Sequence, residues 1–471
     1  MSPFRNISKL FVGDFLAKAL NFLTFVYLAR IFGAKDYGII EFTIAASMYF
    51  LMLADAGLEI WATRQVARAQ DIRILVGRIL PLRILLAIIC FGLLHAAIHI
   101  FRGHVLISAL LSRFSLLLLV QAVNLKWVFM GQERMSKVGT GLILSQIVFS
   151  IGIFAIVQRP SEMFWIPVLR VWADAALVVY FAGLFFAQFR TAPLFSIRNA
   201  LDLLKPSLVI GSSLFLGLIN FNFDSILLGI MIGPAEVGFY SVAYKPVIIG
   251  LAVTATYFVG LFPALSRTFG ADNAEFKKII DRSLRLSALF AIPLGLTGTL
   301  LAKPLFNFLF GEAYLKSVPV FQILIWTAVL VILRGTFKHG LISAGYQGPE
   351  LRRASIAVGL NVILNLFVIP RFGMTGAAFA TLASEVVWGL LTYSCFRKYV
   401  SVVSILPALY HPIAATVLMA VVLLVFADLF WIWRLLLGGV TYAGTLLALG
   451  EKETRHLLTL FPVVAGRNLK S

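Results

Sequence analysis

Charged side chains are scarce in this chain of 471 residues, of which 13% are charged and 60% are hydrophobic. The mean hydropathy of +0.95 is too high for a water-soluble domain, because such a surface would aggregate. Cysteine is rarer still: Cys90 and Cys395 both lie in apolar runs, which indicates buried thiols and argues against a redox pair or a metal site. The sequence therefore predicts an integral membrane protein.

Apolar runs long enough to cross a bilayer follow one another through most of the chain. Since one crossing needs about 20 apolar residues, we predict about fourteen transmembrane helices in an all-α polytopic fold. Only a short polar break near Gly103 separates the third run from the fourth, so twelve or thirteen crossings also fit. The spans are 7–31, 37–61, 79–101, 103–129, 138–158, 163–189, 206–232, 236–265, 285–311, 317–345, 353–370, 374–397, 403–428 and 430–450.

Lysine and arginine outnumber acidic residues and give a net charge of +19, but they gather in alternate loops. This alternation is typical of the positive-inside rule and does not point to nucleic acid. It predicts that both termini lie in the cytoplasm, with basic inside segments at 64–78, 134–137, 190–205 and 267–285. The stretch 266–285 is predicted to be an amphipathic cytoplasmic connector, and no outside loop is long enough for a catalytic domain.

The chain contains an internal repeat. LARIFGAKDYG at 28–38 and LGIMIGPAEVG at 228–238 both place two glycines five residues apart, with an acidic residue shortly before the second glycine. A weaker match pairs the helix that carries Asp174 with the helix that carries Glu385. Because six predicted spans separate the copies, the two halves have parallel topology, an arrangement that suits alternating access.

Short motifs spread over the chain carry a family resemblance. They are the segment 28–38 above, DAGLEI (55–60), VGFYSVAYK (237–245), FPALSR (262–267) and NVILNLFVIPRFGMTGAAFATLASE (361–385). In these motifs the sequence resembles the polysaccharide-exporting flippases of the multidrug/oligosaccharidyl-lipid/polysaccharide superfamily, especially the O-antigen type. The resemblance implies two pseudo-symmetric six-helix lobes, 1–205 and 206–400, around a central cavity. It also implies an added helix pair at 401–450 and a cytoplasmic tail at 451–471.

The same resemblance implies a function in cell-surface polysaccharide assembly. The cargo would be a polyprenyl-diphosphate-linked oligosaccharide, moved across the cytoplasmic membrane by alternating access without a cofactor. Membrane lipids are expected partners, and a polysaccharide polymerase or glycosyltransferases are further candidates. A lipid II flippase or a drug or cation exporter of the same superfamily is the alternative, although cationic cargo favours an acidic cavity.

Basic residues inside the predicted spans are candidates for contact with the phosphates of such a cargo. A central charge that faces lipid costs about 2.5–3.5 kcal/mol, so these side chains must face protein, water or the membrane interface. Arg334 and Lys338 share one helical face with no acid within one turn, and their mutual repulsion favours a bound anion. Lys245 precedes Pro246, where a kink is expected. The candidate substrate-binding residues are Lys18, Lys245, Arg334, Lys338, Arg113 and Lys126.

Simpler interpretations compete for several of these positions. Local salt bridges are spaced correctly within one helix for Asp14 with Lys18 and for Arg170 with Asp174, and Lys245 has Asp224 across its hairpin. Side chains near helix ends can instead snorkel to the interface or form a solvated helix end. The first of these applies to Arg83, Arg113 and Lys126, and the second to Asp55 and Glu59.

Acidic residues inside the spans are candidates for coupling transport to an ion or to the membrane potential, because ionisable groups at membrane depth mark such pathways. The candidates are Asp14, Asp174, Asp224 and Glu385. No catalytic residue and no metal site are predicted. A membrane-embedded glycosyltransferase or polymerase is disfavoured because the sequence lacks an Asp-x-Asp motif, and direct ATP coupling is disfavoured because it lacks a Walker A signature.

Overall fold

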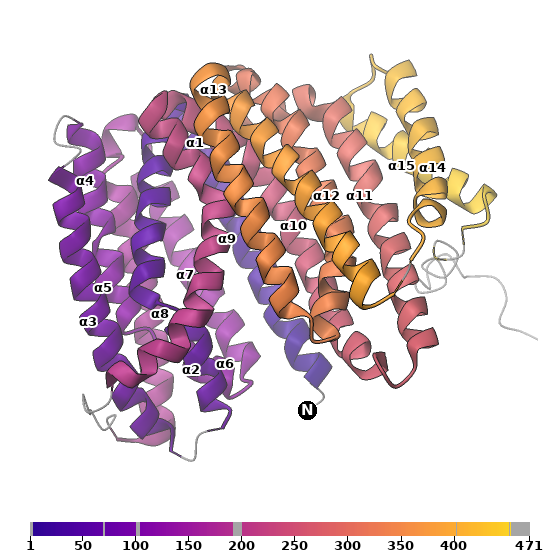
Figure 1. The fold of residues 1–471 in the computed structure, drawn as a ribbon. Coiled ribbons are helices and arrows are strands. Elements are labelled where there is room, and N and C mark those ends of the chain that lie inside the picture. Colours follow the sequence, from indigo (N-terminus) through magenta and orange to yellow (C-terminus); the bar gives the residue numbers. More distant parts are fainter. Residues whose placement is uncertain are drawn as a thin grey trace, which may run out of the picture. The chain divides into compact units, whose positions relative to one another are not determined.

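The computed structural model describes residues 3–68, 71–99, 104–191, 200–401, 403–451 and 453, without the side chains of residues 3–14, 200, 201, 221 and 253. Within these ranges the regular structure is entirely helical, as the composition predicts (Figure 1). The chain forms two compact units, Met1–Ser241 and Val242–Ser471. The division falls later than the predicted lobe boundary between residues 205 and 206, so the lobe, helix-pair and tail boundaries stay predictions.

The first unit contains the helices from α1 to α9 and the start of α10. They are α1 (Pro3–Asp55), α2 (Leu58–Val66), α3 (Ile72–Ile98), α4 (Val105–Phe114), α5 (Leu116–Ala122), α6 (Lys126–Gly131), α7 (Met135–Ile156), α8 (Trp165–Phe189) and α9 (Leu204–Met231), with short 3₁₀ turns at Pro160–Glu162 and Ala200–Leu203. An aromatic core that includes the fully buried Trp127, Phe129 and Phe181 packs α6 against α8.

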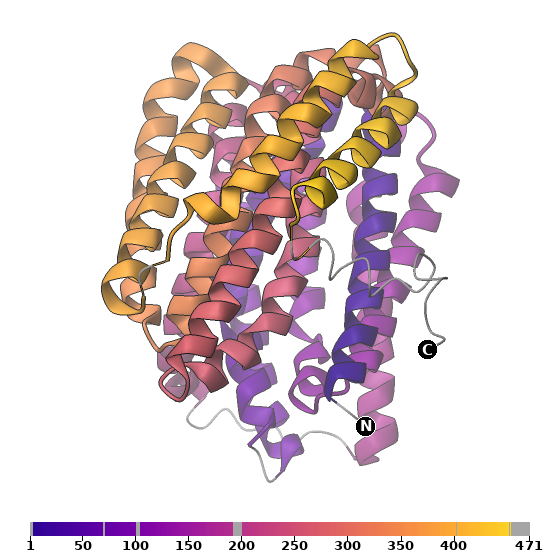
Figure 2. The ribbon, with the colours of Figure 1, turned by 90° about the vertical axis from the view of Figure 1, so that its right-hand side faces the viewer.

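The second unit begins within α10 (Pro234–Thr268). It continues through α11 (Asn273–Phe310), a 3₁₀ turn at Glu312–Ser317, α12 (Val318–Ser343), α13 (Gln347–Tyr399), α14 (Leu406–Val425) and α15 (Trp431–Ala448). A buried core that includes Phe276, Phe337 and Phe396 joins α11, α12 and α13. The last two helices pack side by side, and α14 also contacts α11 (Figure 2).

Two helices are too long to cross the membrane once. Both α1 and α13 contain 53 residues, about 80 Å at about 1.5 Å per residue, against about 30 Å of hydrocarbon. Each is interrupted by a glycine with positive φ, Gly33 (φ 65°) and Gly373 (φ 52°). Side chains pair across each break: the Phe25 and Tyr37 rings lie 5.3 Å apart, and Asn361 donates a 3.1 Å hydrogen bond to Ser384. Each helix is therefore a hairpin that contains two of the predicted spans.

The helix count agrees in kind with the prediction but does not confirm fourteen spans. Ten helices in the described ranges are long and apolar enough to cross a membrane, or eleven if α9, bent by 53° between Asn220 and Asn222, is one broken span. In that count α1 and α13 each contribute one helix.

The hydrophilic stretch 266–285 joins α10 to α11 mostly as helix, and its cytoplasmic location stays a prediction. Asp272 caps α11 by accepting a 2.9 Å hydrogen bond from the backbone N–H of Glu275, and α11 continues from Asn273 through the charged residues into the apolar region. A strong N-cap lets the helix begin before its apolar part, so the polar residues become its first turns.

Candidate functional site

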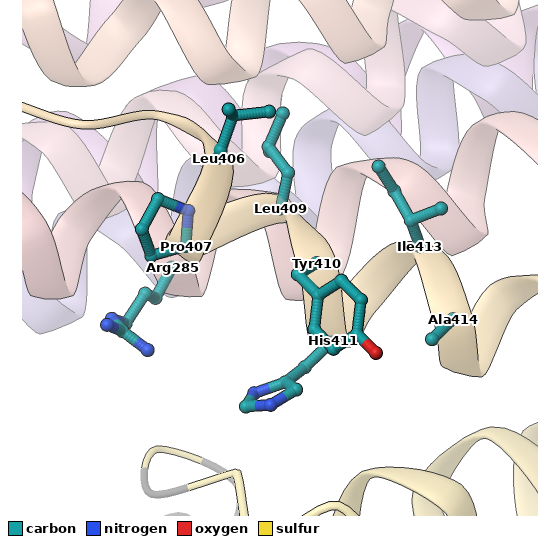
Figure 3. Close-up of a pocket in the computed structure, with 8 residues that line it drawn as sticks. All are labelled: Arg285, Leu406, Pro407, Leu409, Tyr410, His411, Ile413 and Ala414. Carbon is teal, nitrogen blue, oxygen red and sulfur yellow. The ribbon is translucent and has the colours of Figure 1, made fainter.

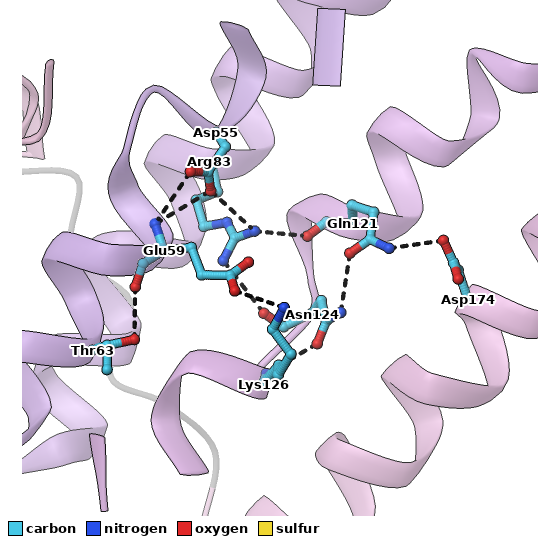
Figure 4. Close-up of polar contacts among 8 residues, drawn as sticks. All are labelled: Asp55, Glu59, Thr63, Arg83, Gln121, Asn124, Lys126 and Asp174. Atoms are coloured by element: carbon cyan, nitrogen blue, oxygen red, sulfur yellow. Dashed lines mark hydrogen bonds and ion pairs between the residues drawn. The ribbon is translucent and has the colours of Figure 1, made fainter. Parts of the chain in front are cut away.

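Each unit contains a cluster of buried charged residues. In the first unit the Arg83 cluster comprises Asp55, Glu59, Arg83, Gln121, Asn124, Lys126, Arg170 and Asp174, of which Figure 4 shows all but Arg170. In the second unit the Arg334 cluster comprises Arg334, Lys338, Glu350, Glu385, Trp388 and Thr392. The two clusters contain five of the ten residues that the sequence singles out as candidates.

The Arg83 cluster forms around a break in one predicted membrane span. The run 103–129 divides into α4, α5 and α6, and residues 123–125 between α5 and α6 are not helical. Such a break leaves backbone carbonyls without partners, which is tolerated at membrane depth only where protein groups satisfy them. The Asn124 side chain binds both flanks, since its Oδ1 accepts from the Lys126 N–H at 2.9 Å and its Nδ2 donates to Gln121 Oε1 at 3.0 Å.

Arg83 supplies the donors that the broken helix lacks. Its guanidinium donates to the backbone carbonyls of Gln121 at 3.0 Å and Asn124 at 3.4 Å, and it lies 3.6 Å from the Asp55 carboxylate. The residue is only 5% exposed. The prediction that Arg83 snorkels to an interface was therefore wrong, because free carbonyls within the unit bind its charge.

Lys126 and Glu59 form the most accessible ion pair of this cluster. Lys126 Nζ lies 2.7 Å from Glu59 Oε1, and the two side chains are 25% and 30% exposed. The prediction of a solvated helix end at Asp55 and Glu59 was wrong, because a base from another helix pairs with each acid. Lys126, a predicted substrate contact, thus already has a carboxylate partner.

Asp174 lies at the other end of the same network. The residue is 3% exposed, and its carboxylate accepts from Gln121 Nε2 at 2.8 Å and from Ser145 at 3.4 Å, and it pairs with Arg170 at 3.1 Å. The predicted pairing of Arg170 with Asp174 within α8 is confirmed. Three acids and three bases balance in this cluster, so it carries no net charge with all groups ionised.

The Arg334 cluster joins α12 to both legs of α13. Arg334 Nε lies 2.5 Å from Glu385 Oε1, and its guanidinium carbon lies 3.7 Å from the centre of the Trp388 ring. A second carboxylate, Glu350, lies 4.0 Å from Arg334 Nη1 and accepts from Trp388 Nε1 at 3.2 Å and Thr392 Oγ1 at 3.1 Å. The predicted Arg334–Lys338 repulsion is thus offset by two acids from another helix, which spacing along α12 could not show.

Lys338 differs from Arg334 in its partners. It is half-buried one turn further along α12, and among the described residues no carboxylate lies within ion-pair distance of its ammonium group. Glu350 and Glu385 act on it only at longer range. Its neighbour His339 stacks on Phe258, with ring centres 4.7 Å apart, and pairs with the Gly335 carbonyl at 2.8 Å.

The remaining predicted residues lie outside these clusters. Arg113 bonds to the carbonyl of Ala109 in its own helix at 3.0 Å and covers the Phe164 ring. Asp224 is 1% exposed and accepts a 2.6 Å hydrogen bond from Tyr240. Lys18 lies in α1 and Lys245 in α10, in different compact units, and the Asp14 side chain lies outside the described residues.

Sequence reasoning missed Glu350 and underrated Trp388. Glu350 lies in a predicted loop between two spans, whereas α13 in fact begins at Gln347. A helical signal was present, since Glu385, Trp388 and Thr392 recur at the spacing of one helix face. Cys90 and Cys395 are free and buried as predicted, and the described part of the chain contains no metal-binding group of His, Cys, Asp or Glu.

A groove of about 630 Å³ on α14 contains none of the predicted residues (Figure 3). Arg285 and His411 are its basic members, and both contact the buried Glu451 carboxylate, Arg285 at 3.8 Å. The lining residues are Arg285, Leu406, Pro407, Leu409, Tyr410, His411, Ile413 and Ala414. Apart from these two side chains and the Tyr410 hydroxyl, the lining residues are apolar, so the groove is mainly an apolar surface.

Helical hairpins, a broken apolar helix and ion pairs buried between apolar helices define a polytopic membrane protein of the kind from which transporters are built. Comparison of the sequence with models of known protein families supports this classification. The chain belongs to the polysaccharide biosynthesis protein family, whose model matches residues 4–269. The model described as lipid II flippase MurJ matches residues 144–437.

Individual proteins show the same likeness. A protein of Escherichia coli (strain K12) described as an O-antigen transporter is 24% identical over 393 residues, which is 81% of this chain and 93% of that protein. A protein of Haloferax volcanii described as a low-salt glycan biosynthesis flippase, Agl15, is 24% identical over 406 residues, 84% of each chain. The solved structure of lipid II flippase MurJ in an inward closed conformation has a TM-score of 0.78 at 13% identity and covers 95% of this chain and 99% of that one. The fold and the family predicted from the motifs are confirmed.

Proposed function

We propose that this chain is a flippase that moves a polyprenyl-diphosphate-linked oligosaccharide across the cytoplasmic membrane by alternating access. Membership of the polysaccharide biosynthesis family and the two named relatives support this cargo class. The protein acts as a transporter and not as an enzyme, with both termini in the cytoplasm. A polysaccharide polymerase or glycosyltransferases acting on the same lipid-linked glycan are proposed partners.

The proposal rests on the surroundings of Lys338. A lysine in an apolar membrane helix is costly unless a partner compensates its charge, and the described residues offer Lys338 no carboxylate at ion-pair distance. A diphosphate has the opposite charge and cannot enter hydrocarbon unaided. Lys338 is therefore the proposed contact for the phosphate groups of the cargo.

Arg334 has a different proposed role from Lys338. Its two carboxylate neighbours and the Trp388 ring fix its position. Arg334 therefore holds α12 in place, and with it the position of Lys338. One guanidinium nitrogen, Nη1, is buried without a hydrogen-bond acceptor among the described residues, which leaves a donor for a phosphate oxygen. Lys18, Lys245, Arg113 and Lys126 stay proposed substrate contacts, and Asp14, Asp174, Asp224 and Glu385 stay proposed coupling residues.

The test is export of a lipid-linked glycan in a cell that lacks its own flippase, with membrane abundance measured for each variant. Wild-type protein should restore export and Lys338→Ala should not, at equal abundance. As a matched control, Lys303→Ala changes another lysine on an apolar helix, which is exposed and outside the cluster, and should export normally. Normal export by Lys338→Ala would exclude Lys338 as the phosphate contact, and no export by any form would count against the cargo class.

A further inference from the structure

The second leg of α1, from Ala34 to Asp55, packs against α9 and the start of α10 with almost no side chains between the backbones at its two ends. All of these residues belong to the first compact unit. At one end Gly38 faces Gly238. A Cβ atom on Gly38 would lie 1.7 Å from the Pro234 carbonyl oxygen, and one on Gly238 would lie 1.9 Å from the Ala34 carbonyl oxygen. Any side chain at either position would therefore push the two segments apart.

The contact is reciprocal and follows the internal repeat. Residues 34 and 38 of the first copy meet residues 238 and 234 of the second, so each copy offers the same carbonyl to the glycine of the other. Close approach of small residues allows backbone contact between membrane helices without interlocking side chains. The sequence repeat thus accounts for a structural contact that neither copy could make alone.

A second backbone contact closes the other end of the same leg. A Cβ atom on Gly57 would lie 2.4 Å from the Gly211 nitrogen, and one on Gly211 would lie 2.7 Å from the Ala56 carbonyl carbon. Between the ends, the Tyr49 and Phe215 rings meet at 5.9 Å. The distance along the helix from Ala34 to Gly57 is about 35 Å at about 1.5 Å per residue, comparable with the thickness of the hydrocarbon. The two contacts are therefore separated by about the thickness of the hydrocarbon layer.

We propose that these contacts are two latches, an outer latch of Gly38 and Gly238 and an inner latch of Gly57 and Gly211, which open one at a time during transport. The names follow the predicted topology, and the inference rests on the proposed transport function. Because no side chains interlock at these contacts, the two segments separate and come together again without a change of side-chain rotamer. Such contacts suit a transport cycle that is repeated many times. As a result, the segment between the latches, which includes the Tyr49–Phe215 contact, is open to only one side of the membrane at a time.

The latches can be held open separately by single methyl groups. Gly238→Ala adds a Cβ at the outer latch, and Gly211→Ala adds one at the inner latch. Both positions have ordinary helical φ, so alanine adds steric pressure without backbone strain. Gly217→Ala is the matched control, because a Cβ on this α9 glycine meets nothing within 4 Å.

Accessibility of the segment between the latches provides the measurement. Tyr49→Cys, in a chain whose Cys90 and Cys395 are replaced by alanine, is labelled with a membrane-impermeant thiol reagent from either side. Gly238→Ala should raise labelling several-fold from the outside alone, Gly211→Ala should raise it from the cytoplasm alone, and Gly217→Ala should change neither. Unchanged labelling in both latch variants, or increases from the same side, would overturn the proposal.

A second measurement keeps the test decisive if the alanine variants fail to accumulate. Lys35→Cys and Glu236→Cys lie beside the outer latch on the two segments and can be joined with a short cleavable reagent. Joining should stop export and cleavage should restore it, whereas undiminished export by the joined protein would show that the outer latch need not open.

The labelling result does not depend on cargo, so one-sided shifts without glycan export would contradict the proposed function and leave the latches standing.

Discussion

The side-chain amide of Gln121 donates a 2.8 Å hydrogen bond to the buried carboxylate of Asp174, and so ties α5 to α8. In the second unit the guanidinium of Arg334 binds the buried carboxylate of Glu385 at 2.5 Å and ties α12 to the second leg of α13. The repeat pairs the helices that carry these two acids. A neutral donor in the first unit and a charged donor in the second therefore link two helices through a buried carboxylate at related places of the repeat.

Substitutions of Arg334 should distinguish the stabilising effect of its fixed contacts from the effect of its charge alone. Arg334→Ala leaves Glu385 and Glu350 buried without their base, which should cost about 3–5 kcal/mol of stability. Arg334→Lys keeps the charge but loses the planar stacking on Trp388, so we expect intermediate stability. Thermal unfolding of the purified protein in detergent gives the measurement. An Arg334→Ala protein as stable as wild type would contradict the bracing role.

Substitution of Lys338 should instead lower export and leave stability unchanged. Because no carboxylate of the described residues lies within ion-pair distance of its ammonium group, Lys338→Ala should retain wild-type stability while glycan export falls. Lys338→Arg retains a cation and should keep much of the export. The same export assay with abundance controls decides, and a Lys338→Ala protein that loses abundance together with export would instead assign Lys338 to structure.

Arg83 offers a test of the broken helix. Arg83→Leu removes the donors for the Gln121 and Asn124 carbonyls and leaves Asp55 without its base, so we expect a loss of about 3–5 kcal/mol. Arg113→Leu is the control, since that guanidinium bonds to a carbonyl of its own helix and should cost under about 1 kcal/mol. Equal melting temperatures for the two variants would show that the break needs no arginine.

Asp14 remains the coupling candidate that the described side chains do not include. Asp14→Asn should slow export without abolishing binding of the lipid-linked substrate, because the acid is predicted to share a polar stripe with Lys18. The measurement compares the export rate with substrate retained by purified protein. Wild-type export by a stably produced Asp14→Asn protein would remove Asp14 from the mechanism.

The predicted orientation can be checked residue by residue. Single cysteines at Lys35, Glu236, Lys316 and Arg371 should react with an impermeant reagent from outside, and a cysteine at Arg73 or Lys278 only after the membrane is opened. Arg198, another predicted cytoplasmic position, lies outside the described residues. Reversed reactivity at two or more of these loops would reject the topology.

Hydropathy and motifs were sufficient to predict the helical membrane fold and the family, because long apolar runs and glycine turns are local features. The partners of Arg83 and Arg334 were not predictable in this way. The break between α5 and α6 carries no proline or glycine, and only Asn124 marks it. Glu350, one of the two acids beside Arg334, lies in a predicted loop that is in fact the first turn of α13. Spacing along one helix reports which side chains share a face, but not which helix that face meets.

The α13 hairpin has a consequence for how the chain enters the membrane during synthesis. In its first leg, buried Asn365 donates to Asn361 at 3.0 Å, and Asn361 in turn donates to Ser384 of the second leg. Glu350 finds its Trp388 and Thr392 donors only on that second leg. The first leg alone would present the Asn361 amide to lipid without its Ser384 partner. We therefore expect the two legs to leave the translocon together, as one inserted pair.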